Sequence, residues 1–222
     1  MKAFELLFPK DIPLLQTLND EEMALLCSET RRSEYRKGEL VHAHCGNCIG
    51  LIYLKEGRAC ATMLSDEGRE AVMFRLNKGE ICILSAACIL RQVCFDVHLE
   101  AECDSSLLIV PTSTVETLMQ RNPEFRCELY RMAAVRFSEV LQNLQLMLFG
   151  SVEKRIANVL VEESVITGSN EIHLTHEQIA RYAGSAREVV SRALKKMTED
   201  GSLRLGRNEI TLLRPELLKA RE

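Results

Sequence analysis

The sequence lacks an apolar run long enough to cross a membrane. Its longest one extends from Ile81 to Leu90 and is interrupted by Ser85, whereas a membrane-spanning helix needs about 20 apolar residues. Residues 1–9 also lack the apolar core of a secretory signal peptide. We therefore expect a cytoplasmic protein with no membrane partner.

Low-complexity segments and a strong charge of one sign are absent too. The 28 basic and 32 acidic side chains leave a net charge of −4, and 46% of the 222 residues are hydrophobic. This composition can supply real hydrophobic cores, and the length favours two domains over one. Bulk attraction of a basic protein to a polyanion is excluded.

Disulfide bonds are not expected, although the chain contains nine cysteines. Without an export signal, cysteines are more often reduced thiols, metal ligands or redox sensors. We interpret four of them as small buried side chains: Cys27, Cys60, Cys103 and Cys127. Cys45 and Cys48 have the spacing of a redox or metal pair, which leaves a thiol redox regulator open as an alternative function.

The most informative segment, residues 174–213, has the pattern of two short helices around a tight turn. Thr175 and Gln178 have the spacing of a capping box at a helix start. Gly184 can adopt the left-handed backbone that ends a helix. Two helices joined by about 3–4 residues that include a glycine form the helix-turn-helix signature.

The second helix of this pair is predicted to begin at Ser185, which stands in capping spacing with Glu188. Its apolar positions recur at helical spacing and are expected to be buried: Val189, Val190, Ala193, Leu194 and Met197. In a helix-turn-helix, the N-terminal residues of the second helix meet base edges in the major groove. The candidate DNA-binding residues are Thr175, Gln178, Arg187, Glu188, Ser191, Arg192 and Lys195.

Arginine and glutamate occur together on the polar face of this helix. Arginine can donate two hydrogen bonds to guanine, and glutamate can accept one from cytosine N4. A carboxylate near phosphates is repelled unless it has a base partner. Each residue alone has an ordinary explanation, because solvated helices usually carry charge and Glu188 could serve only as a cap. The agreement of turn, caps and both faces favours DNA recognition.

A local excess of positive charge accompanies these helices. Residues 181–207 contain seven basic and three acidic side chains, which leaves +4 in a chain of net charge −4. Such a local excess of positive charge is typical of a surface that binds nucleic acid. Residues 203–212 alternate apolar and polar positions around a Gly-Arg-Asn turn, which predicts a small hairpin, or wing.

This segment resembles the Crp/Fnr family of transcription regulators. The resemblance is carried by Gln178-Ile179, Arg187-Glu-Val-Val-Ser-Arg192, Leu194-Lys-Lys196 and Asp200-Gly201. In that family, the positions that match Glu188, Ser191 and Arg192 recognise the operator half-site. Arg187 is similar to a feature by which Crp-type members recognise DNA. The resemblance therefore leaves open whether the half-site preference is of the Crp type or the Fnr type. The resemblance also implies RNA polymerase as a partner.

Residues 34–111 are predicted to form short strands separated by turns, as in a β-sandwich or barrel. Strand character is found at residues 40–41, 51–54, 71–74 and 107–110. The order of strands and turns is similar to the β-roll of cyclic-nucleotide-binding domains. We expect an α+β fold with an N-terminal β-roll (a double-stranded β-helix), a long dimerisation helix and a C-terminal winged helix-turn-helix. These parts are placed at residues 1–120, 121–149 and 150–222.

One feature of such a β-roll is missing. Nucleotide-binding members have a Gly-Glu pair and then an arginine, a small hydroxyl residue and an alanine, and the arginine and backbone N–H groups hold the cyclic phosphate. This chain has Gly79-Glu80, but no Arg-Ser-Ala or Arg-Thr-Ala follows. We expect an effector other than cAMP, or none, and the cofactor remains unknown. The candidate effector-pocket residues are Gly79, Glu80, Cys82, Ser85 and Arg91.

A cupin-like metal-binding β-barrel enzyme is a second alternative, because His42 and His44 resemble a metal-binding pair. The carboxylate ligand expected soon afterwards is missing, and this interpretation leaves residues 174–213 unexplained. We therefore predict no enzyme and assign no catalytic or metal-binding residue. Fnr-type iron–sulfur sensors carry most ligands in an N-terminal extension. The first cysteine here is Cys27, so that cluster is not expected.

Residues 123–149 predict one long helix, because they contain no glycine and no proline after the first position. Apolar residues recur there with the 3-4-3-4-3 spacing of a coiled-coil seam: Tyr130, Ala133, Phe137, Val140, Leu144 and Met147. A core helix is the alternative, but about 26 residues would span about 39 Å. We favour parallel homodimerisation, as the family resemblance implies. The dimer would place two recognition helices about 34 Å apart on a palindromic site.

Overall fold

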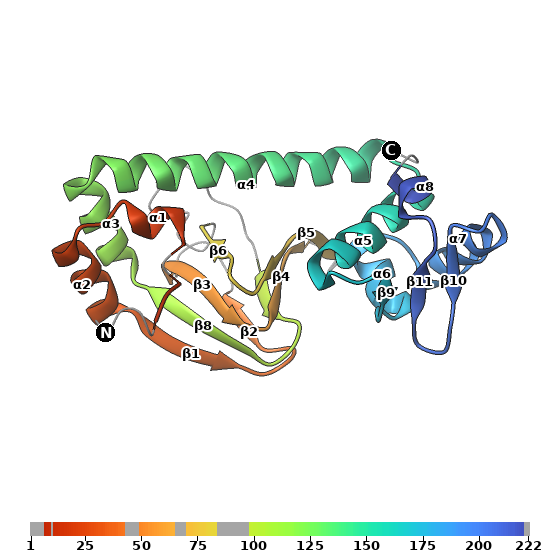
Figure 1. The fold of residues 1–222 in the computed structure, drawn as a ribbon, viewed down its shortest axis with the longest axis horizontal. Coiled ribbons are helices and arrows are strands. Elements are labelled where there is room, and N and C mark those ends of the chain that lie inside the picture. The colour runs from red at the N-terminus through yellow and green to blue at the C-terminus, as the bar shows by residue number, and fades with distance from the viewer. Residues whose placement is uncertain (1–6, 10, 43–48, 65–69, 84–97, 220–222) are drawn as a thin grey trace. The chain divides into compact units, whose positions relative to one another are not determined.

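The computed structural model describes residues 7–9, 11–42, 49–64, 70–83 and 98–219 (Figure 1). These residues form an α+β architecture with two compact units. Unit 1 contains the described residues up to Leu64 together with Phe74–Val140. Unit 2 contains residues 70–73 and the described residues from Leu141 onward. The boundary near residue 140 falls inside a single helix, α4 (Pro123–Phe149).

Two four-stranded sheets make up the N-terminal β-roll. The first sheet contains, in spatial order, β1 (Arg31–Tyr35), β8 (Ser105–Val110), β3 (Leu51–Glu56) and β6 (Ile81–Cys82). The second contains β2 (Leu40–His42), β7 (His98–Ala101), β4 (Arg58–Leu64) and β5 (Glu70–Asn77). The four strand segments predicted from the sequence all lie within strands, and the β-roll is confirmed.

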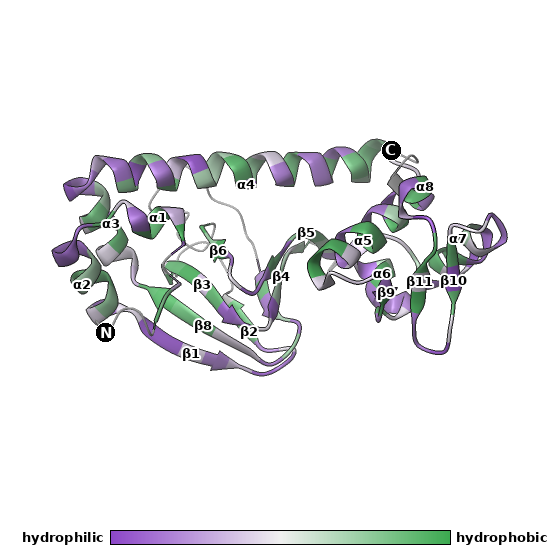
Figure 2. Cartoon of the chain, in the orientation of Figure 1, coloured by the Kyte–Doolittle hydropathy of each residue, from purple (hydrophilic) through white to green (hydrophobic). Residues whose placement is uncertain are grey.

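Burial explains why these segments form strands. Along β5 the buried positions alternate, with Val72, Phe74 and Leu76 inside, as a strand with one covered face requires. The strands β3 and β8 are buried along most of their length, whereas β1 is largely exposed. Figure 2 shows the same contrast, with hydrophobic β3 and β8 beside a hydrophilic β1.

Three helices and the first turns of α4 complete the core of unit 1. They are α1 (Pro13–Gln16), α2 (Asp20–Glu29) and α3 (Thr112–Arg121). Leu14, Leu26, Leu118 and Phe125 belong to one buried cluster with residues of β3 and β8. The amide of Asn122 donates to the Thr17 carbonyl oxygen at 2.8 Å, which links the start of α4 to the first helices.

The long helix predicted at residues 123–149 is present with those bounds. Its first turns bury Phe125 and Leu129, and Met132 and Ala133 pack partly against the same core. Six of the exposed apolar side chains follow another face and also recur every three or four residues: Tyr130, Ala134, Phe137, Leu141, Leu144 and Leu148. We call these six residues the α4 seam.

Of the six residues in the predicted seam, Tyr130, Phe137 and Leu144 are exposed and the other three are half-buried. Ala133 packs on its own domain, and Val140 and Met147 are half-buried. The predicted seam and the α4 seam both have helical spacing and share these three exposed residues. At the other three positions, the member of the α4 seam lies one residue later in the sequence. Within unit 1, Ala133 packs against the buried cluster and its neighbour Ala134 is exposed.

Unit 2 has the winged helix-turn-helix architecture that the sequence predicts. Its helices are the end of α4, α5 (Val152–Thr167), α6 (His176–Ala183), α7 (Arg187–Glu199) and α8 (Pro215–Lys219). Its antiparallel sheet has the order β10 (Leu203–Leu205), β11 (Ile210–Leu212) and β9 (Glu171–Ile172). Ser151 caps α5 by accepting a hydrogen bond from the Lys154 N–H at 3.2 Å. No helix in the described ranges combines the length and apolar character that crossing a bilayer needs.

Candidate nucleic-acid interface

The first helix of the pair, α6, begins and ends as predicted. Thr175 Oγ1 accepts a hydrogen bond from the Gln178 N–H at 3.1 Å, and Gln178 Oε1 accepts one from the Thr175 N–H at 2.9 Å. This reciprocal pair is the predicted capping box. Gly184 ends the helix with φ 55° and ψ 50°, in the left-handed region. The tight turn that follows directs the chain into α7.

The predicted cap of the second helix is wrong, because Ser185 does not cap it. Helix α7 begins at Arg187 with Ala186 as its N-cap, and no side chain caps it. The Ser185 N–H instead donates to the Ala180 carbonyl oxygen at 2.9 Å, which closes the end of α6. Because Ser185 belongs to the end of α6, its spacing to Glu188 no longer matches a capping box. The Glu188 side chain is therefore exposed without a capping role.

Helix α7 separates buried from exposed residues cleanly. Val190, Ala193, Leu194 and Met197 are buried as predicted, and Val189 is half-buried. Five candidate DNA-binding residues are exposed on the same helix: Arg187, Glu188, Ser191, Arg192 and Lys195. Their shared exposure on a helix anchored by its opposite side leaves a polar surface available to a ligand.

The other two candidates, Thr175 and Gln178, stand at the N-terminus of α6. Thr175 is exposed and Gln178 is half-buried. Their oxygen atoms take part in the capping box, whereas the Gln178 side-chain N–H₂ group is not part of that box. Partial positive charge at a helix N-terminus favours anions such as phosphate. Their geometry thus suits a phosphate contact better than base recognition.

The local cations divide into paired and exposed side chains. Arg181 forms two hydrogen bonds with the Glu70 carboxylate, at 2.9 and 2.7 Å, and Lys196 lies 2.7 Å from Glu153 Oε1. These two pairs reduce the positive charge that the sequence count assigned to the segment. Lys196 is itself exposed, and the exposed cations outside these two pairs are Arg187, Arg192, Lys195, Arg204 and Arg207.

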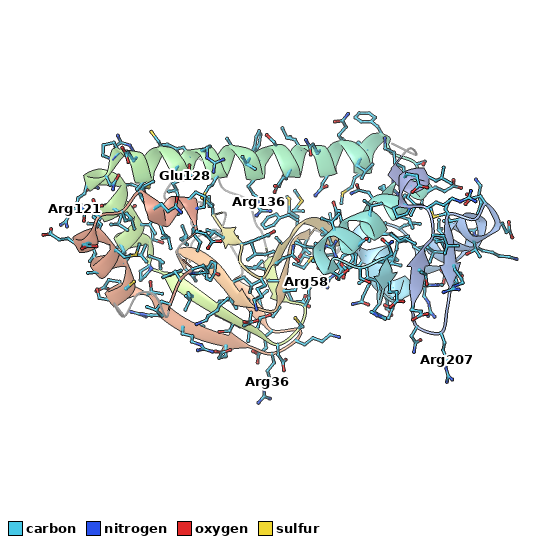
Figure 3. All side chains as sticks on the ribbon, in the orientation of Figure 1. Arg36, Arg58, Arg121, Glu128, Arg136 and Arg207 are labelled. Atoms are coloured by element: carbon cyan, nitrogen blue, oxygen red, sulfur yellow. The ribbon has the colours of Figure 1, made fainter. Side chains whose placement is uncertain are left out.

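Two exposed arginines contribute to the positive charge of the segment but are not among the candidate DNA-binding residues. Arg204 lies on β10, and Arg207 extends from the turn between β10 and β11 (Figure 3). Asn208 in the same turn has φ 64°, which asparagine tolerates better than most residues. Because Arg204 and Arg207 lie in the predicted wing, the sequence could have indicated both as candidate DNA-binding residues.

The effector-pocket candidates in the described residues lie on or beside the turn after β5. The Gly79 N–H donates to the Leu54 carbonyl oxygen at 2.7 Å with φ +89°. Glu80 Oε2 accepts a hydrogen bond from the Asn77 N–H at 3.1 Å and lies 3.8 Å from Arg136 Nη2. Cys82 is buried in β6. The other two candidates, Ser85 and Arg91, lie outside the described residues.

Arg136 links this turn to the long helix. Its guanidinium carbon lies 4.7 Å from the centre of the Phe74 ring, and its Nη1 atom lies 2.8 Å from Glu139 Oε2. The cation therefore meets an aromatic face and two carboxylates, Glu80 and Glu139. Such a site stabilises the guanidinium through cation–π and ionic contacts.

The thiols and histidines of the alternatives are only partly described. His44, Cys45 and Cys48 lie outside the described residues, and so does the side chain of His42. Among the residues that are described, no cluster of three or more His, Cys, Asp or Glu side chains could hold a metal ion.

The prediction of buried cysteines is right for one of its four members. Cys60 is buried, Cys27 is half-buried, and Cys103 and Cys127 are exposed. Partial burial raises the pKa of the Cys27 thiol above its ordinary value. Cys103 lies between β7 and β8, and Cys127 lies on the first turns of α4, where solvent reaches a small side chain.

Comparisons with known proteins agree with this geometry. The family model of the cyclic nucleotide-binding domain matches residues 32–122, and that of the Crp-like helix-turn-helix domain matches residues 154–221. The cyclic AMP receptor protein of Thermus thermophilus is 26% identical over 212 residues, which cover 95% of this chain and 96% of that protein.

Solved structures give the same result. A protein from Eubacterium rectale that is assigned to the Crp/Fnr family of transcriptional regulators is 35% identical, with a TM-score of 0.81. The match covers 95% of this chain and 97% of that one. FixK2 from Bradyrhizobium japonicum has the same fold at 20% identity, with a TM-score of 0.75 over 87% of this chain and 97% of its own.

Proposed function

Because this chain belongs to the Crp/Fnr family of DNA-binding transcription regulators, we propose that it acts as a homodimer on a palindromic DNA site. Helix α7 is the recognition helix of each protomer. Residues 1–120 form the effector domain, residues 121–149 the dimerisation helix and residues 150–222 the DNA-binding domain. RNA polymerase is the further partner that a transcription regulator of this family would contact.

One observation supports base recognition most directly: Glu188 is exposed on α7 and takes no part in capping that helix. A carboxylate on a DNA-facing helix is repelled by phosphates unless a base donor binds it. Glu188 would accept a hydrogen bond from cytosine N4, and Arg187 or Arg192 would bind guanine. Ser191 can contact several bases, and Lys195, farther along the helix, suits a phosphate.

The α4 seam supports the dimer. Its larger members are markedly exposed, with Phe137 at 55% and Leu148 at 65%. Exposed apolar groups in contiguous rows mark interaction surfaces, and burying one leucine or phenylalanine side chain contributes about 1.5–3 kcal/mol. Spacing of alternately three and four residues matches a partner helix of the same kind in a coiled coil. A second copy of α4, packed in parallel, is therefore the proposed partner.

The proposed effector is not cAMP. The fold of a cyclic nucleotide-binding domain is present, but the sequence lacks the Arg-Ser-Ala or Arg-Thr-Ala clamp after Gly79-Glu80. Glu80 is engaged by the Asn77 N–H and lies near Arg136. Titration calorimetry with cAMP should therefore give no saturable heat. Tight stoichiometric binding of cAMP would overturn this part of the proposal.

A signal at the β-roll would act by shifting the population of two dimer states. The two states would differ in the packing of α4, and therefore in the distance between the two recognition helices. Only the state that fits the spacing of the DNA half-sites would bind tightly.

Selection of bound DNA from a random pool, with and without oxidant, tests this function. The expected product is an inverted repeat whose half-site centres lie about one helical turn apart. The oxidant arm tests the thiol alternative, because unchanged enrichment would remove it. Enrichment of an unrepeated motif, or of none, would contradict the proposed function.

A further inference from the structure

One guanidinium in unit 2 binds carbonyl groups from the ends of two different helices. Arg155, in the first turn of α5, donates from Nε to the Ala183 carbonyl oxygen at 2.7 Å. Its Nη1 donates to the Gly150 carbonyl oxygen at 2.9 Å and, more weakly, to that of Met147 at 3.5 Å. The side chain is half-buried, so these contacts are partly shielded from water.

The chemistry of helix ends explains why an arginine fits this position. The last carbonyl groups of a helix lack partners within it and carry partial negative charge. Helix α4 has no basic residue in its last turn. Helix α6 has only Arg181 there, which is bound to Glu70. Arg155 supplies the cation that both helix ends need, and its planar fork can bind both in fixed directions.

The contacts of Arg155 lie at two functionally important places. Met147 lies in the last turn of the proposed dimerisation helix and Gly150 directly follows that helix, whereas Ala183 immediately precedes the turn between α6 and α7. Few residues separate α4 from α5, since Phe149 ends one helix and Ser151 caps the next. Arg155 therefore adds a side-chain link between α4 and the helix-turn-helix beside the backbone link.

The junction itself is tightly packed. A Cβ atom at Gly150 would lie 2.5 Å from the Leu146 carbonyl oxygen and 2.8 Å from the Leu146 Cδ1 atom. Such contacts are too short for a real Cβ atom, so a side chain there would force the backbone to move. The Gly150 N–H also donates to the Leu146 carbonyl oxygen at 2.9 Å. Glycine thus permits the close approach that brings the Gly150 carbonyl to Arg155.

We infer that Arg155 is a positioning residue for DNA recognition: it fixes the orientation of the helix-turn-helix relative to the end of α4. This inference rests on the proposed function, in which α4 is shared by the dimer and α7 contacts DNA. A fixed angle at this junction would set the distance between the two recognition helices. Arg155 would therefore determine the spacing of half-sites that the dimer accepts, without touching DNA.

The test compares the full-length protein with its Arg155→Ala, Arg155→Gln and Arg155→Lys variants on the selected palindrome. The central spacer is lengthened or shortened by one and two base pairs, which moves a half-site by about 3.4 Å per base pair. The wild type should prefer one spacer by at least about tenfold, equivalent to about 1.4 kcal/mol. The alanine and glutamine variants should lose most of this preference, whereas lysine should restore part of it.

Two controls separate positioning from general damage. Discrimination against a mismatched base within one half-site should stay unchanged in the Arg155 variants, because α7 itself is intact. Arg131→Ala removes another hydrogen-bonded arginine, which pairs with Glu128 at 2.6 Å, and should keep the wild-type spacer preference. Unchanged spacer preference in Arg155→Ala, or equal loss of spacer and base discrimination, would overturn the inference.

Amide hydrogen exchange in the absence of DNA gives a second readout. Arg155→Ala should speed exchange at the Gly150, Gly184 and Ser185 N–H groups and leave β10 and β11 unchanged. Exchange that rises throughout unit 2, or nowhere, would contradict a local positioning role. A wild type that binds no palindrome would refute the proposed function, and the exchange result would then report separately on the Arg155 link.

Discussion

The Ser185 N–H lies 2.9 Å from the Ala180 carbonyl oxygen, so the residue expected to begin α7 instead completes α6. This contact gives α7 an N-terminus with no side-chain cap. The predicted capping box would have bound the Glu188 side chain, which instead lies on the exposed face of α7. A small change in the boundary of a helix thus changes the interpretation of a candidate DNA-binding residue.

Replacing Glu188 by glutamine should relax specificity at one base pair while lowering the stability of the fold by less than about 1 kcal/mol, the contribution of a carboxylate in the first turn of a helix. The expected loss of discrimination is about 1–3 kcal/mol, the value of a good base contact. Binding to the selected site and its single-base variants measures it, and thermal unfolding checks stability. Glu199→Gln, at the other end of α7, is the matched control. A lower melting temperature with intact specificity would show that Glu188 acts on the fold instead.

Arg192 and Lys195 should differ in how their loss affects binding. Arg192→Ala should cost about 1–3 kcal/mol and relax one base pair, whereas Lys195→Ala should weaken binding to all sequences and lower the salt slope by about one. Titrations at several salt concentrations distinguish these results. Uniform weakening in the Arg192 variant would indicate that Arg192 contacts only phosphate.

A charge placed in the α4 seam should dissociate the dimer. Leu141→Glu would bury a carboxylate against the partner helix, which is costly for an unpaired charge. Light scattering after size exclusion should then report a monomer. Val135→Glu is a close control, because Val135 is 48% exposed but lies outside the seam. Dissociation by both variants, or by neither, would argue against this interface.

Cys127 should form a disulfide between protomers when the protein is oxidised with diamide. It lies three residues before Tyr130 and continues the spacing of the seam, and its thiol is exposed. In a parallel dimer the two copies would face each other at about the 4.4–6.8 Å between Cα atoms that a disulfide needs. Non-reducing electrophoresis should show a covalent dimer that Cys127→Ser abolishes and Cys103→Ser retains. No cross-link in the wild type, or an equal yield in Cys127→Ser, would contradict this placement of Cys127 at the seam.

Local signals made much of the fold predictable. The capping pair of Thr175 and Gln178 and the left-handed Gly184 depend on near neighbours in sequence, and both are found as expected. The long helix was predictable because residues 123–149 contain no break. The wing followed from alternating apolar residues around a short turn.

Signals that depend on distant contacts were not predictable. Ala133 and Ala134 both suit a helical apolar stripe, and only the packing of α4 on unit 1 distinguishes them. Arg181 belongs to a basic segment in the sequence, yet it binds Glu70, which is far away along the chain. Arg155 gave no sequence signal at all, because its partners are backbone carbonyl groups that any residue could supply.

The order of strands in the small sheet has a consequence for synthesis of the protein. The middle strand, β11, pairs with both β10 and β9, and the Leu212 N–H donates to the Asn170 carbonyl oxygen at 2.8 Å. On the ribosome, β9 and β10 therefore emerge before the strand that joins them. Helices α6 and α7 are therefore translated before residues 210–212, and unit 2 can complete its sheet only after both helices have been made.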